Sequence, residues 1–181
     1  MCGIVAVTGY KKALPLLING LEKLEYRGYD SAGIAIINSE TNSISCNKAE
    51  GKLKNLITNL NDHNIPGTVG IGHTRWATHG KPEVKNAHPH TDSSGNIAVV
   101  QNGIIENFQD LKNKLEKEGI IFNSDTDTEV IPHLIQRELN TLSKLNLETN
   151  GSTLLVALRN VISDLEAVSY THLTLPTILL V

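Results

Sequence analysis

The sequence has no large excess of positive or negative charge, few aromatic side chains and no long apolar run. Its 181 residues hold 16 Lys and Arg against 19 Asp and Glu, without a basic cluster, so a nucleic-acid partner is not expected. Aromatic residues make up only 4%, too few for base-stacking platforms. No apolar stretch reaches the length of about 18 residues that a transmembrane helix needs, so we expect no membrane partner.

Apolar residues are nevertheless abundant enough for a folded core. They make up 40% of the chain, which excludes wholesale disorder, and the length predicts one domain of the common size of roughly 150 residues. The N-terminus has neither the basic region nor the long apolar run of a signal peptide. We therefore expect Cys2 and Cys46 to be free thiols of a cytoplasmic protein.

The spacing of apolar residues predicts a mixture of strands and helices. Short β-branched runs predict strands at 3–8, 33–38, 43–48, 68–73 and 96–101, whereas helical spacing predicts helices at 11–25, 53–60, 105–115 and 153–165 and another through Val130 and Leu134. Ser124 or Asp125 is the expected cap of that last helix. Because strands and helices do not alternate strictly, the pattern favours an α+β layered sandwich.

Cys2 is the first candidate for chemistry because it follows the initiator methionine. Removal of Met1 would leave a thiol and a free α-amine on one residue. An α-amine with a pKa of about 7.7–8.0 accepts a thiol proton near neutral pH, so nucleophile and base would share Cys2. The alternative is a small buried hydrophobic residue, which is the role we expect for Cys46 in mid-strand.

Two further groups of residues suit hydrolysis of an amide that carries an amino-acid head. Asn102 and Gly103 follow an apolar strand and can donate a side-chain and a backbone N–H to an oxyanion. A hairpin turn is the alternative, but residues 104–108 look helical, which weakens it. The 22-residue segment 74–95 is too long for an idle connection, and its Arg75 suits a carboxylate.

Other polar residues complete this candidate set. Thr78 and His79 can add hydrogen bonds near Arg75, and Asp127 can neutralise an ammonium group. Helix capping is the alternative for Asp127, although Asp125 fits that role better. His73, His79, His88 and His90 raise the question of a metal site, but they lack the spacing of metal-binding motifs, and we expect no metal and no cofactor.

Six ordered motifs carry a resemblance to a known family. They are Met-Cys-Gly-Ile-Val at 1–5, Tyr-Arg-Gly-Tyr-Asp-Ser-Ala-Gly-Ile-Ala at 26–35, His-Thr-Arg-Trp-Ala-Thr-His-Gly-Lys-Pro at 73–82, Asn-Ala-His-Pro-His at 86–90, Asn-Gly-Ile-Ile-Glu-Asn-Phe at 102–108 and Asp-Thr-Asp-Thr-Glu-Val-Ile at 125–131. Together they are similar to the glutaminase domain of class II glutamine amidotransferases, which are N-terminal-nucleophile hydrolases. The second and third motifs favour the branch that aminates fructose 6-phosphate over the amidophosphoribosyltransferase and asparagine synthetase branches, and amidophosphoribosyltransferase stays the alternative.

The resemblance implies a four-layer αββα sandwich that hydrolyses L-glutamine without a cofactor. It implies Cys2 as the nucleophile, with Asn102 and Gly103 as the oxyanion hole. The substrate-binding residues that it implies are Arg75, Thr78 and His79 for the α-carboxylate, Asp127 for the α-ammonium, Trp76 in a loop over the substrate, and Arg27 beside the nucleophile. His88 is expected to have a structural role.

The resemblance covers residues 1–166, an incomplete and C-terminally truncated glutaminase domain. Residues 167–181 contain no Asp, Glu, Lys or Arg, and we interpret them as a foreign apolar tail from read-through or artefact, with a final strand as the alternative. In the family, sugar-isomerase domains follow and bind fructose 6-phosphate, in a parent enzyme that we expect to be a homo-oligomer. An inactive, aggregation-prone fragment is the rival hypothesis.

Overall fold

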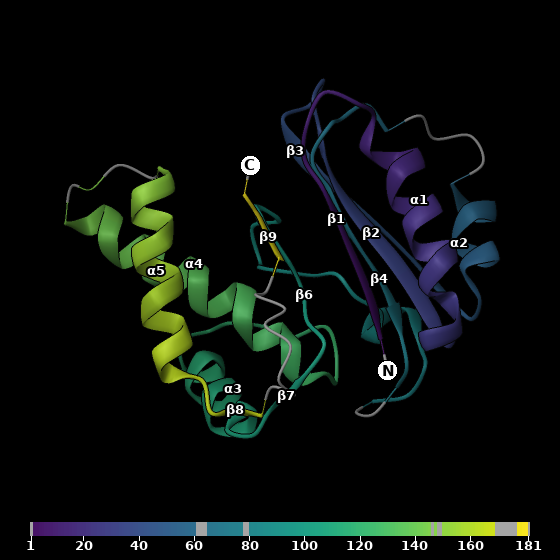
Figure 1. Ribbon diagram of the computed structural model, residues 1–181. Coiled ribbons are helices and arrows are strands. Elements are labelled where there is room, and N and C mark those ends of the chain that lie inside the picture. The colour runs from purple at the N-terminus through teal and green to yellow at the C-terminus, as the bar shows by residue number, and fades with distance from the viewer. Residues whose placement is uncertain are drawn as a thin grey trace.

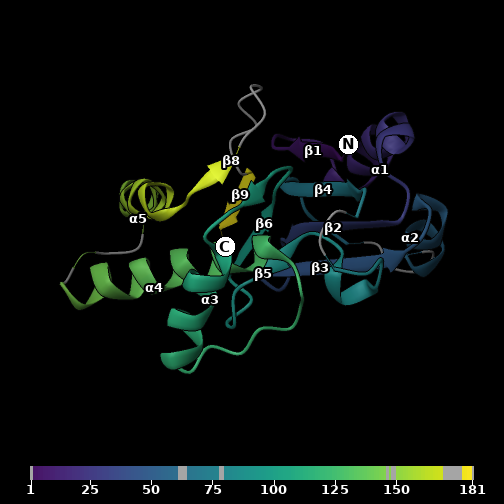
Figure 2. The same ribbon diagram turned by 90° about the horizontal axis from the view of Figure 1, so that it is seen from below.

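Two β-sheets pack face to face in the computed structural model of the chain, and helices cover the outer face of each sheet (Figures 1 and 2). The structure describes residues 2–60, 65–77, 80–145, 147, 150–168 and 177–180. The layers follow one another as helix, sheet, sheet and helix. This arrangement confirms the predicted α+β four-layer sandwich.

The first sheet is antiparallel throughout, with the strand order β1-β4-β2-β3. Leu17 and Leu21 of the covering helix are fully buried against Ile34 of the sheet, which explains the apolar stripe in the sequence. The strands are β1 (Gly3–Val7), β2 (Ser31–Asn38), β3 (Ser43–Glu50) and β4 (Gly70–Arg75), and the outer helices are α1 (Ala13–Leu24), the short η1 (Glu25–Arg27) and α2 (Leu53–Asn59).

The second sheet is smaller and has the order β5-β6-β9, while a separate pair, β7-β8, lies beyond it. Its strands are β5 (His90–Thr91), β6 (Ile97–Val100) and β9 (Thr177–Leu180), and the pair is β7 (Ile104–Ile105) with β8 (Ala167–Val168). The helices on this side are α3 (Phe108–Lys117), α4 (Val130–Lys144) and α5 (Gly151–Asp164), and two short 3₁₀ turns are η2 (Val84–Asn86) and η3 (Asp127–Glu129).

Strand β6 lies at the centre of the molecule and is buried on both faces. Ile97 and Val99 belong to the core shared with the outer helices, whereas Ala98 and Val100 belong to the core between the sheets. A strand with both faces covered needs a continuous apolar run rather than an alternating one. The chain then leaves β6 at Gln101, beside the first sheet.

Two local expectations are corrected by the structure. Ile104 and Ile105 form β7, not the start of a helix, because they pair with a distant strand, and the helix begins at Phe108. Neither Ser124 nor Asp125 caps α4, whose first residue is Val130 and whose N-terminus has no side-chain cap among the described residues. Ser124 donates its hydroxyl to the Glu129 carboxylate instead.

The last described residues form strands, since the backbone of 177–180 pairs with β6 and that of 167–168 with β7. Pairing does not test whether residues 167–181 are foreign to the family, so that interpretation stays a prediction. Among the described residues, no helix combines the length and apolar character needed to cross a bilayer.

Candidate active site

Strand register gathers the N-terminus and two loops at one end of the first sheet. Gly3 pairs with Thr74, and Ser31 pairs with Arg75, so the residues just before β1 and β2 and just after β4 meet there. We call this the site end; the N-terminus marks it in Figure 1. Cys2 therefore lies next to Trp76, although 74 positions separate them.

The Cys2 sulfur lies against the backbone of Trp76. The Trp76 N–H donates to Cys2 Sγ at 3.4 Å, and the Trp76 carbonyl oxygen lies 3.9 Å from the same sulfur. Burial raises the pKa of the Cys2 thiol; the Trp76 amide opposes this shift and the Asp30 carboxylate adds to it. A thiol with a raised pKa is mostly protonated near neutral pH, so a nucleophilic Cys2 needs a nearby base.

Asp30 fixes the backbone that faces this sulfur. Its N–H donates to the Arg75 carbonyl oxygen at 3.2 Å, and its carboxylate accepts a short hydrogen bond from the Ala77 N–H. Gly28 allows the backbone at residue 28 to pack closely against that of Arg75, because a Cβ at this position would lie 2.7 Å from the carbonyl carbon of Arg75. Asp30 and Gly28 were not predicted from the sequence as site residues, although both belong to the second of the six motifs, which begins Tyr-Arg-Gly-Tyr-Asp-Ser.

Asn102 approaches Cys2 from the second sheet. Its side-chain nitrogen Nδ2 lies 3.4 Å from the Cys2 carbonyl oxygen, and both Asn102 and Gly103 are exposed at the end of β6. The Asn-Gly pair is not a hairpin turn, because the strand that follows pairs with residues 167–168 and not with β6. The structure thus brings Asn102, one of the two predicted oxyanion donors, next to the predicted nucleophile, and Gly103 follows it in the chain.

The two predicted charged residues for substrate are both buried. Arg75 is 4% exposed, and its guanidinium donates to the carbonyl oxygens of Lys81 at 3.3 Å and Gly80 at 3.4 Å. Asp127 is 6% exposed, and its carboxylate accepts a 2.8 Å hydrogen bond from the Ile105 N–H. Thr78 and His79, predicted to assist Arg75, lie outside the described residues.

Asn86 connects the surroundings of these two charges and was also missed. This fully buried side chain donates from Nδ2 to the Lys81 carbonyl oxygen at 3.0 Å, and its Oδ1 accepts from the Asp125 N–H at 2.8 Å. It therefore ties the loop held by Arg75 to the segment that carries Asp127. Its place in the Asn-Ala-His-Pro-His motif was the available signal.

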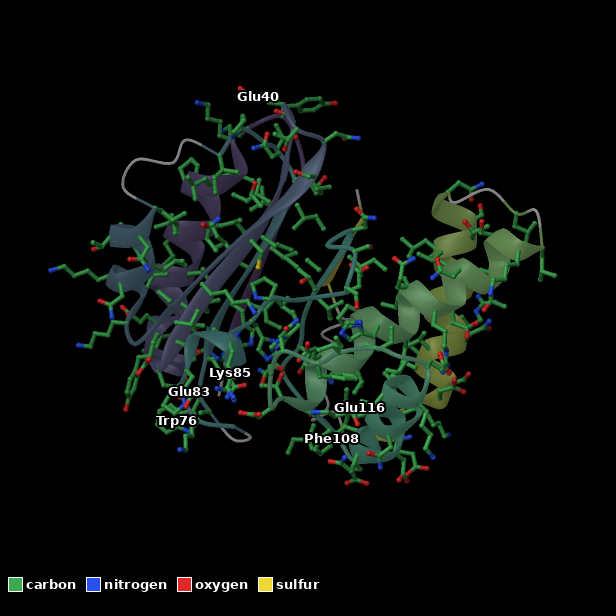
Figure 3. The ribbon with its side chains drawn as sticks, turned by 180° about the vertical axis from the view of Figure 1, so that it is seen from behind. Glu40, Trp76, Glu83, Lys85, Phe108 and Glu116 are labelled. Atoms are coloured by element: carbon green, nitrogen blue, oxygen red, sulfur yellow. The ribbon has the colours of Figure 1, made fainter. Side chains whose placement is uncertain are left out.

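Trp76 and Arg27 lie at the outer margin of the site end. Trp76 is 46% exposed and packs edge-on against Tyr29, with ring centroids 5.4 Å apart, and Figure 3 shows Trp76 at the end of the first sheet. Arg27 is half-buried and ends η1 immediately before Gly28. The backbone of Trp76 thus lies against the Cys2 sulfur, whereas its ring faces solvent.

Three of the four histidines considered for a metal form a buried stack between the sheets. The rings of His73 and His88 are parallel, with centroids 4.3 Å apart, and His90 meets His88 edge-on at 4.7 Å. Burial lowers the pKa of His73 to about 3 and that of His88 well below its ordinary value. In the described part of the chain, no group of three or more His, Cys, Asp or Glu side chains is arranged so that it could hold a metal ion.

Comparison with known proteins gives consistent matches. Residues 48–146 match the family described as "Glutamine amidotransferase domain". The chain is 60% identical over 136 residues, 75% of its length, to glutamine--fructose-6-phosphate aminotransferase [isomerizing] of Gloeobacter violaceus, and 53% identical over 166 residues, 92% of its length, to the enzyme of that name from Thermosynechococcus vestitus. These matches cover 22% and 25% of the two relatives, so the chain spans about a quarter of their length.

Two solved structures share the fold. Glutamine phosphoribosylpyrophosphate amidotransferase from B. subtilis, in complex with ADP and GMP, is 30% identical with a TM-score of 0.71, over 92% of this chain and 33% of the other. A structure described as the allosteric regulatory enzyme of purine biosynthesis is 28% identical with a TM-score of 0.75, over 99% of this chain and 35% of the other.

Proposed function

The chain belongs to the glutamine amidotransferase domain family, and from this premise we propose that it hydrolyses L-glutamine to glutamate and ammonia with Cys2 as the nucleophile. The family assignment confirms the resemblance found in the six sequence motifs. The single observation that carries the proposal is the position of Cys2 at the site end, where its sulfur lies against the Trp76 backbone and its carbonyl oxygen lies 3.4 Å from the side-chain nitrogen of Asn102.

The reaction begins with transfer of the thiol proton to the α-amine that Cys2 has once Met1 is removed. The thiolate sulfur attacks the side-chain amide carbon of glutamine, and the carbonyl oxygen becomes an oxyanion held by the Asn102 side chain and the Gly103 N–H. The protonated amine gives its proton to the leaving nitrogen, which departs as ammonia. Water then hydrolyses the γ-glutamyl thioester on Cys2 and releases glutamate.

Recognition of the amino-acid head falls to the buried charges. Arg75 binds the α-carboxylate with help from Thr78 and His79, and Asp127 binds the α-ammonium group. A planar guanidinium suits a carboxylate, and its burial strengthens the interaction because solvent screening is reduced. In this proposal Trp76 closes over bound glutamine and Arg27 flanks the nucleophile.

For the whole protein we propose transfer of this ammonia to fructose 6-phosphate, which yields glucosamine 6-phosphate. The support is the activity for which the relatives are named, and this chain spans about a quarter of their length. Fructose 6-phosphate would bind to domains outside residues 1–181. A cytoplasmic location and a homo-oligomeric parent remain predictions, as do the domain bounds 1–166 and the foreign origin of 167–181.

Replacement of the sulfur tests the proposal directly. Cys2→Ala is expected to abolish glutamate release, whereas Cys46→Ala, on β3 with its sulfur 3.9 Å from the Pro89 carbonyl oxygen, serves as the matched control and keeps it. Intact mass measurement of each protein reports loss of Met1 and the true C-terminus. Normal turnover by Cys2→Ala, or by protein that retains Met1, would refute the mechanism, and a monodisperse but inert wild-type protein without Met1 would favour the inactive fragment.

A further inference from the structure

We infer that His73 and His88 are positioning residues: they hold the backbone of Gln101 by its carbonyl oxygen and its N–H and thereby aim the donors of Asn102 and Gly103 at the substrate. The inference rests on the proposed glutaminase function and deepens it. Neither histidine touches the reacting atoms in this scheme.

Three hydrogen bonds hold Gln101, and we call them together the grip. His73 Nε2 lies 3.2 Å from the Gln101 carbonyl oxygen, and the Gln101 N–H donates to His88 Nδ1 at 3.4 Å. The Thr128 hydroxyl also donates to the Gln101 side-chain oxygen Oε1 at 3.0 Å. All three partners are at least nine-tenths buried, so the bonds lie away from competing water.

Ordinary sheet pairing does not reach this point of the chain. The ladder of β6 ends at Val100, and residues 101–103 belong to no strand. Backbone polar groups at such a point still need partners when water is excluded. The two imidazoles supply them for Gln101, and the next residues along the chain are the proposed oxyanion donors.

The hydrogen bonds assign a neutral tautomer to each ring. His73 Nε2 faces a carbonyl oxygen and must carry the hydrogen, whereas His88 Nδ1 faces an N–H and must offer its lone pair. The lowered pKa of both rings, caused mainly by burial, keeps them neutral near neutral pH. The remaining nitrogen of His73, Nδ1, is buried without a hydrogen-bond partner among the described residues.

Residues that serve only as packing would show a different substitution pattern from residues that grip. A glutamine side chain places its amide near the position of Nε2 of the imidazole that it replaces, and an asparagine places its amide near Nδ1. If the grip matters, His73→Gln and His88→Asn preserve function, and His73→Asn and His88→Gln do not. If only volume matters, the same amide is tolerated at both positions.

The experiment compares these four full-length variants in glutamine hydrolysis. We expect the two mismatched variants to have kcat lower by about 10- to 100-fold, the scale of a small misplacement of reacting groups, with KM for glutamine changed by no more than about twofold. Alkylation of Cys2 by iodoacetamide, followed by peptide mass, is the control. That displacement at a saturated carbon forms no oxyanion, so its rate should stay at the wild-type value in every variant.

Amide hydrogen exchange at Gln101 reads the grip without any turnover. Exchange should be faster in His88→Gln than in His88→Asn. If a mismatched variant fails to fold, Thr128→Val takes its place; it removes only the third hydrogen bond and should lower kcat by a few-fold. Equal kcat in all four variants, or equal Gln101 exchange in His88→Gln and His88→Asn, overturns the inference. If wild-type protein fails to hydrolyse glutamine, the proposed function falls while exchange at Gln101 still decides the grip.

Discussion

The first sheet and the segment that follows β6 hold their site residues by different kinds of bonds. In the first sheet, Cys2 and Arg75 lie at the ends of paired strands, where Gly3 faces Thr74 and Ser31 faces Arg75. Residues 101–105, which we call the donor segment, are held at Gln101 by His73 and His88 and at Ile105 by the Asp127 carboxylate. The site therefore has two halves: backbone pairing positions the first sheet, and buried side chains position much of the donor segment.

The difference predicts how each half responds to substitution. A strand ladder depends on backbone groups, so most side-chain changes leave it in place, and it is displaced only where a new atom meets the backbone. Within the donor segment, residues 104–105 pair with β8, whereas residues 101–103 depend on individual side chains, each of which a single substitution removes. Activity should therefore respond to backbone clashes on the first side and to lost polar groups on the second.

The largest effect after loss of the sulfur itself is expected at the donor segment. Asn102→Ala removes one proposed oxyanion donor, which should lower kcat by about 10²–10³, or about 2.7–4 kcal/mol in the barrier. Steady-state glutamine hydrolysis measures it, and Asn113→Ala on α3 is the control because its amide oxygen accepts only from Gln109 in that helix. A decrease smaller than about tenfold would argue against the oxyanion role.

On the ladder side, a backbone clash should have the next largest effect. A Cβ at position 28 would lie 2.7 Å from the Arg75 carbonyl carbon and 3.0 Å from the Trp76 nitrogen. Gly28→Ala should therefore displace the segment that faces Cys2, with about a 100-fold loss of turnover and about 1–3 kcal/mol lower unfolding free energy. The matched control is Gly151→Ala, where a Cβ meets nothing within 4 Å; equal behaviour of the two variants would contradict the expected clash.

The same contrast explains which parts of the fold were predictable from sequence. Helix α1 and strand β6 were found because their burial repeats locally, as a stripe in one and a continuous run in the other. Strand order was not, since β1 pairs with β4 across more than 60 residues. Ile104 and Ile105 were misassigned to a helix because two residues carry no period, and their partners, residues 167–168, lie far along the chain.

The candidate site divides in a similar way. Cys2, Arg75, Asn102 and Asp127 were selected because each side chain has a chemistry that suits an amide substrate. Asp30 and Asn86 were missed because they act on the backbone of distant segments, and a side chain's type does not reveal which backbone it will meet. The motifs contained them, but only the register of the strands shows what they hold.

Substrate affinity offers a third test, at the boundary of the two halves. Arg75→Ala should raise KM for glutamine by about 10- to 100-fold, because hydrogen bonds to charged groups contribute about 1.5–3 kcal/mol. Arg75→Lys should recover little, since a point charge lacks the paired donors of a guanidinium. Arg159→Ala, at an exposed position of α5, is the control, and a change confined to kcat would count against carboxylate binding.

A smaller effect is expected at Asn86, which ties the two halves together. Asn86→Ala removes the bonds to Lys81 and Asp125 and leaves the proposed charges in place, so KM should rise by no more than about tenfold while kcat is nearly kept. The control, Asn55→Ala, removes a 2.9 Å bond to the Glu50 carbonyl oxygen. A loss of kcat with unchanged KM would show that Asn86 does not support substrate binding.

The smallest effect on activity at neutral pH is expected at Glu129. In acid, however, this residue should distinguish the stability of the donor segment from that of the first sheet. Burial by itself raises the pKa of its carboxyl group, but His133 and hydrogen bonds from the Asn123 and Ser124 amides outweigh burial and lower the pKa from 4.5 to about 2. A group with a lowered folded-state pKa stabilises the fold above its unfolded-state value, and this contribution is lost as the pH falls from about 4.5 toward 2.

Acid should therefore loosen the donor segment and its support before it loosens the paired strands of the first sheet. Glu129 follows Asp127 in the same short turn, so protonation releases residues 123–129 and with them the support of the donor segment. The ladder between residues 34–37 and 44–47 of β2 and β3 contains no side chain that titrates in acid, unlike β4, which carries His73. Hydrogen exchange between pH 5 and pH 2.5 should show earlier loss of protection at 123–129 than at 44–47 of β3. Glu129→Gln should already exchange faster at 123–124 at pH 7 and change less with acid, and simultaneous loss in both halves would show that they are not held independently.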